Sequence, residues 1–135
     1  MSDQHSTKQG TQLVGESSPW GLIDHAGSIA EGISHVSTPS HGGVLLSEEN
    51  NLRVPEEWRR FDGWYEEDCE WSIAFTFLRD VIMKGTDEVS IRVLKDGTVE
   101  RTLKAWYPSI HRSLSEKATA YNQEQFTAEN QRRTA

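Results

Sequence analysis

Two residues of this 135-residue sequence could carry acid–base or nucleophilic chemistry: His41, beside a glycine pair, and Cys69, the one cysteine. Histidine titrates near neutral pH, and a deprotonated thiol is a strong nucleophile. Carboxylates lie close to the cysteine at Glu66, Glu67 and Asp68. A small enzyme that pairs His41 with Cys69 and uses a nearby carboxylate is therefore one interpretation. The acids weigh against it, because negative charge disfavours the thiolate, and the surrounding sequence has no known nucleophile signature.

The remaining ligand-forming residues do not follow the spacings of known metal or cofactor motifs. The five histidines and one cysteine form neither a C-x-x-C nor an H-x-x-x-H pair, and no D-x-D-x-D-G calcium loop is present. The sequence also has no phosphate-binding P-loop, no dinucleotide fingerprint and no G-x-S-x-G elbow. We therefore expect neither a metal nor a cofactor.

Most of the charge imbalance lies in one stretch, 47–72. The chain has 21 Asp and Glu against 14 Lys and Arg, a formal net charge of −7, and this stretch holds nine of the acids against three arginines. One interpretation is a solvated face with acids at helix starts. The other is an acidic docking surface, where complementary charge and interleaved aromatic side chains bind a basic partner. The candidate binding residues are Glu48, Glu49, Glu56, Glu57, Trp64, Tyr65, Glu66, Glu67, Asp68 and Glu70.

Charge and composition exclude several classes of function. Net negative charge argues against direct, non-specific binding to nucleic acid or acidic membranes, because both need a basic surface. No apolar run approaches the roughly 20 residues of a membrane helix, and the first ten residues lack the apolar core of a secretory signal. A single cysteine cannot form an internal disulfide, so we expect a reducing, cytoplasmic location.

Short elements must position these residues. Turn-forming Gly and Pro break residues 20–46 into runs that predict three short antiparallel strands. Ser47 is a good helix N-cap before two glutamates, and Pro55 is expected to begin a short helix over 55–60. The strongest helical period of apolar residues covers 66–82, which predicts the central helix of the core.

The second half of the chain is less regular. Residues 88–98 are compatible with a strand or a helix; the alternation of apolar residues favours a strand over 88–94, followed by a helix over 99–107. The prediction is therefore an α+β fold, in which a small antiparallel sheet packs against two or three helices. The single domain covers 19–115, between a disordered arm over 1–18 and a flexible or partly helical tail over 116–135.

Several strings together carry a family resemblance. They are Pro19-Trp20-Gly21, Thr38-Pro39-Ser40-His41-Gly42-Gly43, Leu46-Ser47, Val54-Pro55, Gly63-Trp64-Tyr65-Glu66-Glu67-Asp68-Cys69-Glu70-Trp71, and Arg101-Thr102-Leu103-Lys104 followed by Trp106-Tyr107-Pro108. The sequence resembles, over roughly 19–108, a small domain of unknown function carried by bacterial plasmids and phages. That domain occurs alone or attached to larger mobile-element proteins. The resemblance implies a mobile-element accessory protein and no established catalytic residues.

Charge and resemblance together favour a non-enzymatic function. We expect an accessory protein of a phage or plasmid that binds a basic surface on a host or mobile-element protein through its acidic face. Such a protein can inhibit a host defence or nucleic-acid-binding protein by presenting carboxylates where phosphates would lie, as a DNA mimic does. The alternative is the small enzyme built on His41 and Cys69.

Overall fold

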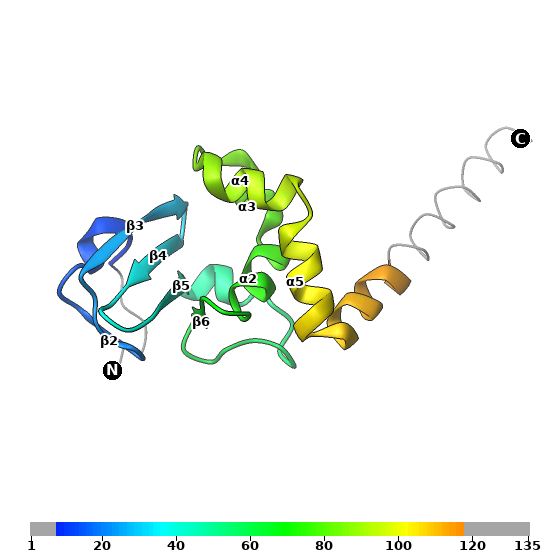
Figure 1. The fold of residues 1–135 in the computed structure, drawn as a ribbon, viewed down its shortest axis with the longest axis horizontal. Helices are drawn as coiled ribbons and strands as arrows, with labels where there is room; N and C mark the ends of the chain where they lie inside the picture. Colours follow the sequence, from blue (N-terminus) through cyan, green and yellow to red (C-terminus); the bar gives the residue numbers. More distant parts are fainter. Residues whose placement is uncertain (1–7, 118–135) are drawn as a thin grey trace, which may run out of the picture.

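A four-stranded antiparallel sheet forms the centre of the computed structural model, which describes residues 8–117 (Figure 1). Short runs of alternating residues, separated by turns, pair in the order β3–β4–β5–β6. The strands are β3 (His25–Ala30), β4 (Ile33–Ser37), β5 (Gly42–Leu46) and β6 (Trp64–Glu66). The tight turn between β3 and β4 holds Gly32 at a φ of 74°, a conformation that favours glycine.

The N-terminal segment covers one face of this sheet. It contains the 3₁₀ helix η1 (Gly10–Leu13) and a small hairpin of β1 (Ser17–Ser18) and β2 (Gly21–Leu22). Leu13 is 1% exposed and lies in a small apolar cluster, whose other buried members are Ile23, Val36 and Leu45. The predicted disordered arm is therefore wrong for residues 10–18, while residues 1–7 lie outside the described part of the chain.

Helices cover the opposite face and bury the larger core. They are α2 (Trp71–Phe77), α3 (Arg79–Lys84), α4 (Glu88–Lys95), α5 (Thr98–Trp106) and a last helix that begins at 108 and continues to 117, where the described residues end. Alternation along the strands sends Val44, Leu46 and Tyr65 into this core with the helical residues. These two layers on an antiparallel sheet confirm the α+β prediction.

The predicted helix over 66–82 is correct in its apolar period but wrong in its start and continuity. Glu66 pairs with Gly43 in the sheet, so the helix begins only at Trp71. Leu78 leaves helical geometry, with φ −108° and ψ 18°, and separates α2 from α3. Both helices still bury apolar side chains, since Phe75 of α2 is 5% exposed and Ile82 of α3 is 0% exposed.

The predicted strand over 88–94 is wrong, because these residues form α4. The Asp87 side chain caps the helix by accepting the Ser90 amide at 3.2 Å. Val89 is 64% exposed whereas Leu94 is buried, as expected for a helix with one buried face. In so short a run, the alternation of apolar residues in the sequence is compatible with a strand as well as a helix. Gly97, at a φ of 87°, turns the chain into α5, which agrees with the helix predicted over 99–107.

The stretch between β5 and β6 holds the first of the predicted short helices and not the second. Ser47 caps α1 (Glu48–Asn51) as expected, accepting the Asn50 amide at 3.2 Å. The helix predicted over 55–60 is wrong: the chain forms a turn there, and Arg59 donates to the carbonyls of Val54 and Leu52 at 2.9 and 3.2 Å. None of the described helices is long and apolar enough to cross a membrane.

Candidate functional site

The glycine pair places His41 and Glu66 beside each other at one end of the sheet. Gly43 pairs with Glu66, and the Glu67 amide donates to the Gly42 carbonyl at 3.0 Å. A side chain at Gly43 would collide with the Trp20 ring, so the glycine lets this indole lie directly on the strand. Ring centroids of Trp20 and His41 lie 5.7 Å apart. The strand pairing and the indole together fix the position of the imidazole.

Glu66 is the centre of a hydrogen-bonded cluster. Its Oε2 lies 3.0 Å from His41 Nε2. Its Oε1 accepts the Cys69 amide at 2.7 Å, the Cys69 thiol at 3.2 Å and the Glu70 amide at 3.3 Å. In return, Glu70 Oε1 accepts the Glu66 amide at 3.1 Å. We call these reciprocal bonds among Glu66, Cys69 and Glu70 the Glu66 brace, and the two residues that they enclose, Glu67 and Asp68, the acidic turn.

The end of α5 closes the cluster from the helical side. Tyr107 follows that helix, and its hydroxyl lies 3.3 Å from Cys69 Sγ. Burial raises the pKa of the Tyr107 hydroxyl above its ordinary range, and the contact with Cys69 raises it further. The phenol is therefore neutral and can donate a hydrogen bond to the sulfur. The cluster consequently joins the sheet to the helical layer.

Protonation states in the cluster follow from these contacts. Burial alone would raise the pKa of Glu66, but hydrogen bonds from Cys69 and His41 outweigh it and lower that pKa to about 2. The bond to Glu66 raises the pKa of His41, with added attraction from Glu67 and Asp68. Burial, then the neighbouring glutamates, raise the pKa of the Cys69 thiol despite an opposing effect of Tyr107. Near neutral pH the cysteine is a thiol and Glu66 a carboxylate.

The structure thus brings His41 and Cys69 into one cluster, with Glu66 between them. Nucleophilic catalysis needs the base in contact with the nucleophile, and a nucleophile that ionises readily. Here a carboxylate with a pKa near 2 contacts the thiol, and the imidazole bonds the other carboxylate oxygen. The contacts stabilise the turn and do not activate the sulfur.

The candidate acidic residues divide into separate groups. Glu48 and Glu49 begin α1, just beyond the Leu46 end of β5, whereas the acidic turn adjoins the Gly42 end. These ends lie roughly 13 Å apart along the strand. Exposed Glu56 and Glu57 belong to the turn after α1. Glu66 and Glu70 are used inside the brace, and Tyr65 is fully buried.

Tyr65 has a structural role instead. Its hydroxyl donates to Asn51 Oδ1 at 2.6 Å and accepts the Arg60 amide at 3.1 Å, and Asn51 in turn donates to the Arg60 carbonyl at 2.8 Å. Burial raises the pKa of Tyr65 to about 12. This closed network ties β6 to α1 and to the following loop. Trp64 is partly buried on the other face, edge-on to Trp20 at a centroid distance of 5.6 Å.

Sequence reasoning did not assign Trp20 and Tyr107 to the site. Trp20 and Tyr107 belong to the strings that carry the family resemblance, but their contacts depend on tertiary structure. Phe61 and Trp106 are 84% and 62% exposed, the most exposed large aromatic side chains of the described residues.

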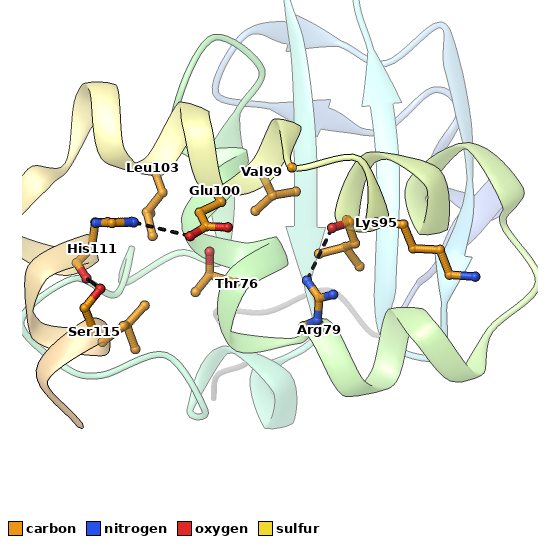
Figure 2. A pocket seen from close by; sticks show the side chains of 11 residues that line it. Thr76, Arg79, Lys95, Val99, Glu100, Leu103, His111 and Ser115 are labelled. Atoms are coloured by element: carbon orange, nitrogen blue, oxygen red, sulfur yellow. Dashed lines mark hydrogen bonds and ion pairs between the residues drawn. The ribbon is translucent and has the colours of Figure 1, made fainter. Parts of the chain in front are cut away.

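A separate cavity of about 480 Å³ lies among the helices (Figure 2). Two contacts bond polar side chains of its lining within the protein. His111 Nε2 lies 3.5 Å from Glu100 Oε1, and Arg79 donates to the Leu94 carbonyl at 3.5 Å. Figure 2 shows His111 and Glu100 reaching toward each other beside Leu103. None of the residues predicted to form a site lines this cavity.

Comparison with known proteins identifies a family without an assigned activity. Residues 14–135 match DUF7007, a domain of unknown function. Neither a curated protein nor a solved structure matches the chain. The match includes the sheet, the Glu66 brace and the helical layer, and it begins within the segment that covers the second face of the sheet. Because the match spans most of the sequence, the chain belongs to the DUF7007 family.

Proposed function

We propose that the chain is a non-enzymatic accessory protein of a bacterial plasmid or phage, which binds a basic protein surface through the acidic turn. The observation that carries the proposal is the Glu66 brace, which holds the two exposed acids of the turn from inside. Preorganised groups lose less conformational freedom on binding, so their charge contributes more to affinity. Glu67 keeps about half of its side chain exposed, at 53%.

Two exposed aromatic side chains, each next in sequence to a residue that contacts the brace, support the same proposal. Phe61 follows Arg60, whose Nε lies 3.4 Å from Glu70 Oε2. Trp106 precedes Tyr107, which contacts Cys69. Each aromatic residue is therefore next in sequence to a residue whose side chain contacts the brace. Aromatic anchors beside fixed charges are typical of interface hot spots.

The partner that fits is a bacterial nucleic-acid-binding or defence protein whose binding groove is basic. Two carboxylates held in one turn can take the place of neighbouring phosphates in such a groove. The enzyme alternative receives less support, because the only thiol is neutral and its contacting carboxylate is a weak base.

Capture from a bacterial lysate, followed by affinity measurement with the identified partner, tests the proposal. Two pairs of acids allow a matched comparison. Glu67→Gln with Asp68→Asn alters the acidic turn, and Glu48→Gln with Glu49→Gln alters α1 with the same change in charge and nearly the same side-chain size. We expect the first pair to weaken binding about tenfold and the second less than about twofold. Phe61→Ala with Trp106→Ala should also weaken it.

Salt and nucleic acid distinguish the mechanism of binding. Raising ionic strength should weaken the complex, and the partner's own DNA or RNA should compete with the chain. EDTA is present throughout, so that bound cations play no part. Binding that ignores salt, or that both pairs of substitutions weaken equally, would show that the acidic turn is not the docking surface.

A further inference from the structure

We propose that His41, Glu66 and Asp68 form a binding site for a first-row divalent transition-metal ion such as Zn²⁺. Each side chain offers one ligand atom, and the three atoms lie within 4.8 Å of one another. His41, the residue before β5, meets two residues from much later in the sequence: Glu66 of β6 and Asp68 of the acidic turn. This site is additional to the docking function and does not rest on it.

Neighbouring groups already orient two of the ligands. Cys69 occupies Glu66 Oε1 through its amide, at 2.7 Å, which leaves Oε2 facing His41. On the other side of the imidazole, His41 Nδ1 lies 3.6 Å from Glu67 Oε1. Histidines that bind metals commonly direct their second ring nitrogen toward a carboxylate, which fixes the tautomer and the ring. The arrangement therefore assigns Nε2 as the metal-binding nitrogen and Glu67 as its support.

Charge and geometry suit a cation of this class. Three carboxylates surround one imidazole, so the site has an excess of negative charge. Zinc binds histidine nitrogen and carboxylate oxygen at about 2.0–2.2 Å, which places ligand atoms about 3–4 Å apart. His41 Nε2 and Glu66 Oε2 already lie 3.0 Å apart, and exposed Asp68 can move inward. An imidazole ligand favours zinc and its neighbours over calcium or magnesium.

Other histidine–carboxylate pairs in the chain provide a comparison. His25 Nδ1 lies 3.1 Å from Asp24 Oδ1 on an exposed surface, and His111 Nε2 lies 3.5 Å from Glu100. Neither pair gathers a third ligand: within residues 8–117, the His41 cluster is the only convergent group of three. His25→Gln is therefore a matched control for His41→Gln.

Titration calorimetry of the tag-free, full-length chain with ZnCl₂ tests the site after dialysis against EDTA and then buffer. We expect one Zn²⁺ per chain with a micromolar dissociation constant. His41→Gln and Asp68→Asn should each weaken binding at least tenfold, while His25→Gln should change it less than twofold. Paramagnetic Co²⁺ should quench part of the tryptophan fluorescence, because the Trp20 ring lies 5.7 Å from that of His41.

Three results would overturn the proposal. The first is the absence of both heat and quenching at millimolar metal. The second is an equal loss of Zn²⁺ affinity in His25→Gln and His41→Gln. The third is binding of Mg²⁺ and Ca²⁺ as tight as that of Zn²⁺, which would indicate only screening of surface acids. Circular dichroism verifies that each variant folds. If His41→Gln unfolds, Asp68→Asn still decides the question, since the Asp68 side chain is exposed.

Discussion

Glu66 and Cys69 are joined twice, because one carboxylate oxygen accepts both the amide, at 2.7 Å, and the thiol, at 3.2 Å, of the same residue. This double contact closes the turn that carries the chain's most distinctive string. It also joins the last strand of the sheet to the first long helix. The stability of the turn should therefore depend on the carboxylate more than on any exposed acid nearby.

Removing the Glu66 side chain should destabilise the protein. Hydrogen bonds to a charged group contribute more than neutral ones, so Glu66→Ala should lower the free energy of unfolding by about 2 kcal/mol. Glu66→Gln keeps an acceptor oxygen and should cost about half as much. Urea unfolding measures both, and Glu57→Gln, an exposed acid of the earlier turn, should change stability by less than about 0.5 kcal/mol. Equal effects at Glu57 and Glu66 would contradict the role of the brace.

Stability should also depend on pH through this cluster. The pKa of Glu66 falls from 4.5 to about 2 on folding, so its contribution is complete above pH 4.5 and is lost as the pH falls toward 2. The pKa of His41 rises from 6.5, so its contribution is complete below pH 6.5 and is lost as the pH rises through the folded value. Both contributions are therefore largest between about pH 4.5 and 6.5.

Urea midpoints between pH 2.5 and 9 measure this dependence. His41→Gln should flatten the alkaline side of the profile, and Glu66→Gln the acid side, although each also removes the other residue's partner. His25→Gln is the control, since His25 is an exposed histidine paired with one aspartate. An unchanged alkaline slope in His41→Gln would assign the dependence to other groups.

The sequence predicted an element correctly where its local pattern was compatible with only one type of secondary structure. Ser47 before two glutamates predicted α1, and the apolar period of α2 and α3 predicted a core helix. The sequence did not decide between a strand and a helix for residues 88–95, because their short alternation of apolar residues is compatible with both periods. In the structure, Asp87 caps a helix there. The predicted start of the central helix was wrong for a tertiary reason: pairing with Gly43 holds Glu66 in the sheet.

The candidate site was predictable in its members but not in its connections. Residue types drew attention to His41 and Cys69, and adjacent acids suggested a carboxylate partner. Which acid lies between them depends on the register of β5 against β6, which no local signal specifies. Tyr107 lies 38 residues beyond Cys69, so only the packing of α5 brings it to the thiol.

Cys69 should react slowly with thiol reagents. Its pKa is raised by burial and by nearby glutamates, so little thiolate is present near neutral pH. With Ellman's reagent at pH 8 we expect the folded protein to react at least about tenfold more slowly than the same chain in guanidinium chloride. Tyr107→Phe should slow the reaction further, because the phenol lowers the thiol pKa. A folded protein that reacts faster than the unfolded chain would revive the nucleophile hypothesis.

The N-terminal segment offers a sharp test of the second apolar cluster. Leu13 is 1% exposed against the sheet, whereas its neighbour Val14 is 49% exposed. Truncating a buried leucine removes its transfer free energy and leaves a cavity, so Leu13→Ala should destabilise the protein by about 2–4 kcal/mol. Val14→Ala should cost less than about 0.5 kcal/mol. Urea unfolding of both variants decides whether this segment is part of the folded unit. If the two substitutions had similarly small effects, the packing of Leu13 on the sheet would contribute little to the free energy of unfolding.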